Sequence, residues 1–116
     1  MKAQLSCCWF SGSLLALWLV SGASGFAWAD DPQRGAEVFQ ANCETCHGPQ
    51  GHGDGPAGQV LDPQPKNLPE LAARASDDYL FWRVSTGKPG TSMAPWAGIL
   101  TGEQIWQAVA YIRTLK

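Results

Sequence analysis

Two cysteines and a histidine lie within five residues of one another, in Cys43-Glu44-Thr45-Cys46-His47. Thiols and imidazoles bind metals, form disulfides and react with electrophiles. Five glycines follow between Gly48 and Gly58. Such a stretch favours neither a helix nor a strand, and a long loop in a small domain is usually functional. The sequence therefore predicts that the chemistry of the protein lies here.

Several chemistries compete for the two cysteines and the histidine. A zinc site needs further Cys or His ligands, and residues 48–116 offer only His52. A thioredoxin-like dithiol needs a βαβ setting, which the helical pattern of this chain lacks. A structural disulfide is chemically possible but leaves His47 without a role. The remaining interpretation is C-x-x-C-H, the covalent attachment site of c-type haem.

The spacing of the three residues suits that interpretation. Residues i, i+3 and i+4 of a helix share one face. Cys43 and Cys46 can therefore both reach the two haem vinyl groups, while the imidazole of His47 lies under the iron.

The iron then needs a sixth ligand or an open coordination site. Met93 is the only methionine after Met1, and it lies 46 residues after His47 in the loop sequence GKPGTSMAPW. A lone methionine ordinarily fills a core, but a position between two prolines in a loop favours a ligand. The alternative, His52, is five residues from His47 and would have to cross to the far side of the haem plane.

The first part of the 116-residue chain has the composition of a secretory signal peptide. Lys2 gives a positive start, residues 9–20 are mostly apolar, and Ala27-Trp28-Ala29 has the A-x-A form of a cleavage site. We expect residues 1–29 to be removed and residues 30–116 to form one domain.

The alternative is that residues 1–29 remain as a membrane anchor. Their apolar run is shorter than the ~20 residues that span a bilayer. Cys7 and Cys8 precede that run, so they do not predict a lipid-anchored cysteine at the cleavage site.

Residues 30–116 carry seven basic and ten acidic side chains, a net charge of −3. This balance is unfavourable for binding nucleic acid, because the phosphates require a basic protein surface. A domain this small has a thin core and often needs a disulfide, a metal or a cofactor for stability.

The remaining sequence predicts an all-α protein. Asp31-Pro32 is typical of a helix start, and a short helical turn is predicted at residues 69–74. Ser76 is predicted to cap a further helix, which ends at Gly87. A capping box, Thr101 with Gln104, predicts a final helix to about Leu115. Its apolar stripe is Ile105, Ala108, Val109, Ile112 and Leu115, with Gln107 and Arg113 pointing away.

Several motifs in order resemble the class I monohaem c-type cytochromes of bacteria, the group of cytochrome c6 and the short c-551 and c-552 proteins. The resemblance covers residues 33–115. It includes Gly35 and Phe39, Cys43-x-x-Cys46-His47-Gly48, Gly53-Asp54-Gly55-Pro56, Pro65-Lys66-Asn67-Leu68, Gly87, Met93-Ala94-Pro95-Trp96, and the segment from Leu100 to Arg113. One departure is Ala94, where many members have proline directly after the methionine.

The resemblance implies a cytochrome c-like fold of three to five helices around one covalently bound haem, over residues 30–116. It implies that Gly35 permits a close crossing of the first and last helices, where Phe39 and Tyr111 pack. It implies that the glycine-rich loop wraps the haem edge, and that the carbonyl of Pro56 accepts a hydrogen bond from His47.

For five further side chains, two alternative positions remain open. Trp82, Trp96 and Trp106 pack either near the haem or simply in the core. Lys66 and Arg83 either meet a haem propionate or face solvent.

The expected function is one-electron transfer in the periplasm, with Cys43 and Cys46 binding the haem, His47 and Met93 binding its iron, and no enzymatic turnover. Two alternatives remain: a gas-binding or sensor haem, and an anchored or tightly bound subunit of a larger oxidase or dehydrogenase. The expected partners are an electron donor and an acceptor, such as a membrane oxidase or a periplasmic dehydrogenase. The net charge suggests that a partner carries some basic surface.

Overall fold

The computed structural model describes residues 29–116, and the predicted signal peptide lies outside the described residues except for Ala29. Within that range the chain forms five α-helices and one 3₁₀ helix, without strands; a single bridge pairs Ala97 with Leu100. The all-α prediction is confirmed. The elements are α1 (Pro32–Asn42), α2 (Glu44–His47), η1 (Gly58–Val60), α3 (Leu68–Ala72), α4 (Asp77–Thr86) and α5 (Gly102–Ile112).

The helix starts follow the capping residues predicted from the sequence. Oδ1 of Asp31 accepts from the amide of Gln33 at 2.9 Å, and Oγ of Ser76 accepts from that of Tyr79 at 3.2 Å. Thr101 and Gln104 form both hydrogen bonds of a capping box. Each side chain satisfies an amide that has no partner within its own helix.

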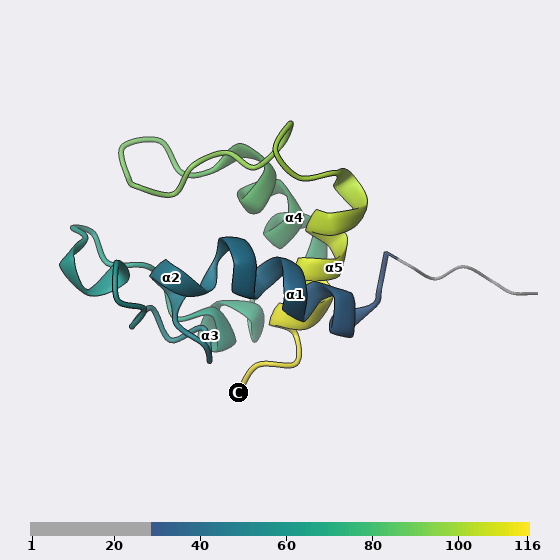
Figure 1. Cartoon of the computed structure of the whole chain (residues 1–116), viewed down its shortest axis with the longest axis horizontal. Coiled ribbons are helices and arrows are strands. Elements are labelled where there is room, and N and C mark those ends of the chain that lie inside the picture. Colours follow the sequence, from purple (N-terminus) through teal and green to yellow (C-terminus); the bar gives the residue numbers. More distant parts are fainter. Residues whose placement is uncertain (1–28) are drawn as a thin grey trace, which may run out of the picture.

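The first and last of these helices, α1 and α5, cross at the centre of the molecule (Figure 1). A Cβ atom at Gly35 of α1 would collide with the backbone of Gln107, so only glycine allows this approach. The rings of Phe39 and Tyr111 pack beside the crossing, with centroids 5.2 Å apart. The predicted crossing is therefore present in the structure.

The hydrophobic core spreads from this crossing. Phe39, Ile105 and Val109 are fully buried, and Leu80 of α4 joins the same core. Gln107 was predicted to point away, and that prediction was wrong: only 4% of it is exposed, because α1 covers this side of α5. Its side-chain amide donates to Oε1 of Glu103 at 3.2 Å, one helical turn earlier.

Arg113 was also predicted to point away, and instead it joins α5 to the turn between α3 and α4. Its Nε donates to Oδ1 of Asp77 at 2.6 Å, and its Nη2 donates to the carbonyl of Ala75 at 2.6 Å. Nη1 donates to the carbonyl of Ala72. The last carbonyls of a helix lack partners within it, so the guanidinium supplies donors for the end of α3.

The helix ends differ from the prediction by a few residues. Helix α5 stops at Ile112 rather than near Leu115, and α3 occupies Leu68–Ala72 rather than residues 69–74. Helix α4 ends before Gly87 as predicted, where φ is 64°. No helix within residues 29–116 is long and apolar enough to cross a lipid bilayer.

Candidate cofactor site

A cavity of about 500 Å³ lies beside the core. Its walls come from the α1–α2 junction, residues 61–66, helices α3 and α4, and the loop of residues 88–96. This volume is within the ~300–1,000 Å³ range of small-molecule and cofactor sites. Cys43, Cys46, His47 and Met93 all line it, so the structure brings the four predicted site residues together.

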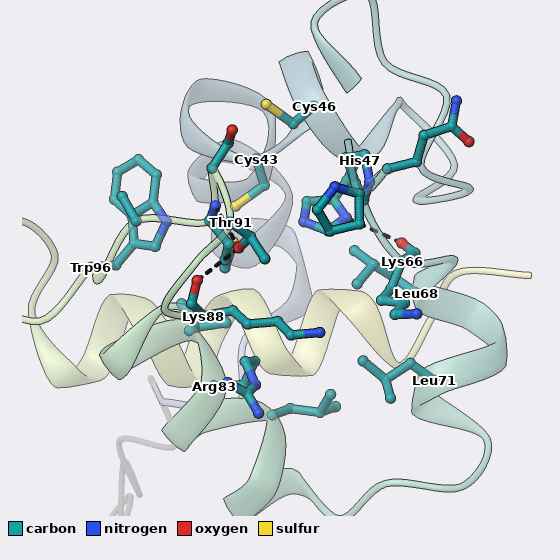
Figure 2. A pocket seen from close by; sticks show the side chains of 18 of the residues that line it. Cys43, Cys46, His47, Lys66, Leu68, Leu71, Arg83, Lys88, Thr91 and Trp96 are labelled. Carbon is teal, nitrogen blue, oxygen red and sulfur yellow. Dashed lines mark hydrogen bonds between the residues drawn. The ribbon is translucent and has the colours of Figure 1, made fainter. Parts of the chain in front are cut away.

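Cys43, Cys46 and His47 are placed by one helical turn. Cys43 ends α1, where its amide donates to the carbonyl of Phe39 at 2.8 Å, and its own carbonyl accepts from the amide of His47 at 2.9 Å. Both sulfurs and the imidazole lie on the same wall of the cavity (Figure 2). The two thiols are free rather than joined as a disulfide.

The glycine-rich loop wraps this turn closely. The amides of Gly53 and Gly55 donate to the carbonyls of His47 and Cys46, at 2.7 and 3.2 Å. A Cβ atom at Gly55 or Gly58 would collide with the backbone of Thr45 or Cys46. These glycines therefore allow the loop to approach the cysteine–histidine turn itself, while the predicted approach to the haem edge stays a prediction.

The ring of His47 is oriented by Lys66. Its Nδ1 lies 3.3 Å from the Lys66 carbonyl oxygen (Figure 2). A carbonyl only accepts, so Nδ1 carries the proton and Nε2 keeps a lone pair for a metal. The prediction that Pro56 supplies this carbonyl was wrong, because the carbonyl at hydrogen-bonding distance from Nδ1 belongs to Lys66.

Burial shifts the pKa of both kinds of side chain. It lowers the pKa of His47, and the hydrogen bond with Lys66 opposes this effect only in part, so the neutral imidazole is favoured near pH 7. Burial, with a smaller contribution from Cys46, raises the pKa of the Cys43 thiol to about 12. Before haem is attached, the Cys43 side chain is therefore a neutral thiol rather than a reactive thiolate.

Met93 is carried by a loop that hydrogen bonds among Lys88, Thr91 and Met93 close. The Lys88 amide donates to the Met93 carbonyl at 3.0 Å. The hydroxyl of Thr91 donates to the Lys88 carbonyl at 2.7 Å and accepts from the Met93 amide at 3.2 Å. The amides of Trp96 and Ala97 then donate to carbonyls in the last turn of α4, which anchors the loop to that helix.

The charged residues of the lining are all basic. Lys66, Arg74, Arg83 and Lys88 line the cavity, and no carboxylate from residues 29–116 does. Sequence reasoning singled out Lys66 and Arg83 but missed Arg74 and Lys88, because a lone basic residue in a loop has no distinguishing pattern. A group of cations without counter-ions fits a ligand with negative charges.

Two further predictions concern tryptophan and His52. Of the three tryptophans considered, only Trp96 lines the cavity. Trp106 stacks on Phe81 at 4.4 Å between ring centroids and packs against the core, and Trp82 is half exposed. His52 lies outside the cavity lining, with Nε2 3.0 Å from the Lys116 carbonyl oxygen, so the structure does not favour it as an iron ligand.

A model of the family described as cytochrome c oxidase, cbb3-type, subunit III matches residues 30–112. The chain belongs to this family of c-type cytochromes. Cytochrome c6 of Thermosynechococcus vestitus is 33% identical over 98 residues, which cover 84% of this cytochrome and 82% of the relative.

Longer proteins contain a similar unit. The cbb3-type cytochrome c oxidase subunit FixP of Azorhizobium caulinodans is 33% identical over 99 residues, which are 83% of this cytochrome and 32% of FixP. The cytochrome thus spans about a third of the length of that relative. A chain of the reducing HAO-like protein complex of Kuenenia stuttgartiensis superposes with a TM-score of 0.67 and 29% identity, over 74% of this cytochrome and 43% of that chain.

These likenesses confirm the cytochrome c fold and the cofactor, covalently bound haem c with its iron. The lining fits this group: it offers thiols, an imidazole, a thioether and apolar walls, and its cations suit the two propionates of the haem.

Proposed function

We propose that this cytochrome carries single electrons in the periplasm through one haem c, attached at Cys43 and Cys46 and ligated by His47 and Met93. The observation that supports the proposal is that two thiols, an oriented imidazole and a methionine thioether line one cavity. Bound haem supplies an iron that alternates between the ferric and ferrous states.

Each of the four side chains has a distinct role in this proposal. Cys43 and Cys46 hold the haem through thioether bonds, so it cannot dissociate between partners. His47 presents Nε2 to the iron, because its Nδ1 is bonded to the Lys66 carbonyl. Met93 presents a soft sulfur, which favours ferrous iron and raises the reduction potential.

Export is part of the proposal. It rests on the signal-like composition of residues 1–29, and the haem-binding cysteines fit an extracytoplasmic protein whose haem is attached after export. The mass of the mature N-terminus would test cleavage between Ala29 and Asp30.

The optical spectrum and mass of the purified protein test the haem and its ligands. We expect the mass of the polypeptide plus one haem, and the weak red charge-transfer band of ferric iron bound to methionine sulfur. The band should be lost in Met93→Ala while the haem stays attached. A colourless protein of bare polypeptide mass would exclude the proposal, and ready binding of carbon monoxide by the unmodified ferrous protein would favour a sensor.

A second candidate function is a permanent electron-transfer subunit of a larger oxidase. The observation that favours it is the similarity to FixP, which is named as a cbb3-type oxidase subunit. Gel filtration of native extracts separates the two: a free carrier elutes at about its own mass, and a bound subunit co-elutes with haem proteins of much larger mass.

A further inference from the structure

Arg83 of α4 has a half-buried guanidinium that lines the cofactor cavity. Its Nη1 donates to the Gly87 carbonyl at 3.1 Å, and its Nη2 donates to the hydroxyl of Tyr79 at 3.3 Å. The side chain is therefore held at both ends of its fork rather than free to rotate. Figure 2 shows it on the α4 wall of the cavity, with Lys66 and Lys88 on other segments around the same space.

Trp82 lies against this guanidinium from outside the cavity. Its ring centre is 4.5 Å from Cζ of Arg83, and that of Tyr79 is 5.6 Å away. Half of the Trp82 surface is exposed, and the ring takes no part in the cavity lining or the hydrophobic core. Exposure of a large indole is unfavourable without a local partner, and the face of tryptophan is the strongest aromatic site for a cation.

The positive charge of Arg83 has no carboxylate partner within residues 29–116. The ion pairs there are Arg34 with Asp31 and Arg113 with Asp77. The other charged groups of the cavity, Lys66, Arg74 and Lys88, have the same sign as Arg83. Like charges repel one another in a partly desolvated site. The Arg83 guanidinium therefore needs other contacts to hold it beside the cavity.

We propose that Trp82 and Tyr79 are positioning residues, which hold the Arg83 guanidinium against the haem carboxylates and thereby raise the reduction potential. The inference rests on the proposed haem function and deepens it. A fixed positive charge beside the haem destabilises the ferric form, which carries one more positive charge than the ferrous form. A guanidinium released into solvent acts through water and is screened by salt.

The test is spectroelectrochemistry of the holoprotein at neutral pH and low ionic strength. Arg83→Gln removes the charge and so gives its full effect. We expect the equilibrium constant for one-electron reduction of this variant to fall about tenfold, which lowers its reduction potential by roughly 59 mV. Trp82→Leu should produce about a third of that change on the logarithmic scale, because the charge remains but moves. Trp82→Phe should retain most of the wild-type potential. Tyr79→Phe loses only the hydroxyl, so its potential should fall between those of the Trp82→Phe and Trp82→Leu variants.

A double-mutant cycle separates positioning from a general structural effect. Trp82→Leu should have no effect on the potential once Arg83→Gln is present, since there is no charge left to position. Ile99→Ser, which removes another exposed apolar side chain outside the cavity lining, is the matched control and should leave the potential unchanged.

An unchanged potential in Trp82→Leu, or an equal shift with and without Arg83, would overturn the inference. In every variant the haem mass and the methionine band are read first. Their absence from the unmodified protein would count against the proposed function, whereas their presence with no Trp82 effect would count against this inference alone.

Discussion

At the scale of single residues, the structure shows which groups hold the two proposed iron ligands in place. His47 is oriented by the Lys66 carbonyl, and Met93 by the hydroxyl of Thr91. The Thr91 side chain both donates and accepts, so it closes the loop before any iron–sulfur bond exists. A ligand held in this way loses less conformational freedom on binding.

Thr91→Val should weaken the proposed bond between Met93 and the iron. The change keeps the shape of the side chain but removes two hydrogen bonds, at about 0.5–1.5 kcal/mol each. We expect the methionine band to disappear at a lower urea concentration than in the unmodified protein, measured by absorbance during titration. Thr91→Ser retains the hydroxyl and should behave nearly as the unmodified protein; equal sensitivity of the Val and Ser variants would contradict this role.

At the scale of helices, the fold depends on how closely α1 and α5 approach. The backbone carbonyl of Gln107 occupies the space that a side chain at Gly35 would need. Backbone atoms cannot rotate away as the end of a side chain can, so the two helices would have to separate.

Gly35→Ala should therefore destabilise the protein despite the higher helix propensity of alanine. Overpacking costs about 1–3 kcal/mol, which corresponds to a fall of roughly 4–20 °C in the melting temperature of a domain this size. Gly102→Ala is the matched control, because the nearest atom to its new Cβ is 4.0 Å away. A Gly35 variant that melts no lower than the Gly102 variant would show that the crossing can relax.

Arg113→Leu should loosen the junction of α3 and α4. The exposed ion pair with Asp77 contributes less than about 1 kcal/mol, while the carbonyls of Ala72 and Ala75 lose charged donors. We expect a combined loss of about 1–2 kcal/mol in the free energy of unfolding, measured by urea denaturation. Asp77→Ala removes the ion pair alone and should cost less; equal losses would place the whole effect in the ion pair.

The helix starts and the helical turn that carries Cys43, Cys46 and His47 were predictable because their signals are local. Asp31, Ser76 and Thr101 cap helices through amides two or three residues away. The cysteine–histidine turn likewise needs only its own spacing. Apolar periodicity then indicated which side of α5 is buried.

The errors concern contacts between segments far apart in the sequence. Gln107 is buried by α1, and Arg113 reaches carbonyls some 40 positions earlier in the chain. The resemblance implied Pro56 as the partner of His47, whereas the structure has Lys66, since sequence alone does not say which loop carbonyl faces the ring. The basic lining formed by Arg74 and Lys88 also requires the folded arrangement of α3, α4 and the loops.

At the scale of the whole molecule, the haem cavity is large relative to the domain. Without haem, the mainly apolar walls of this cavity of about 500 Å³ face water and contribute no burial energy to folding. A native protein has only about 5–15 kcal/mol of stability in total. The haem is thus a structural component as well as a redox centre.

A variant with both Cys43→Ser and Cys46→Ser, produced without haem, should therefore lose cooperative folding. We expect reduced helical circular dichroism at neutral pH and no sharp thermal transition, whereas the holoprotein should melt cooperatively. The same variant reconstituted with free haem should regain part of its helicity, because His47 and Met93 remain. A haem-free variant that melts at the holoprotein's temperature would contradict this expectation.

The crossing of α1 and α5 also sets an order of events during synthesis. Gly35 and Gln107 lie near opposite ends of the described chain, so their contact must wait until almost all of the polypeptide is available. If the chain passes the membrane amino end first, as export requires, the pair of thiols emerges while α1 still lacks its counterpart. If export occurs as proposed, Cys43 and Cys46 would be accessible for haem attachment before α5 packs against α1.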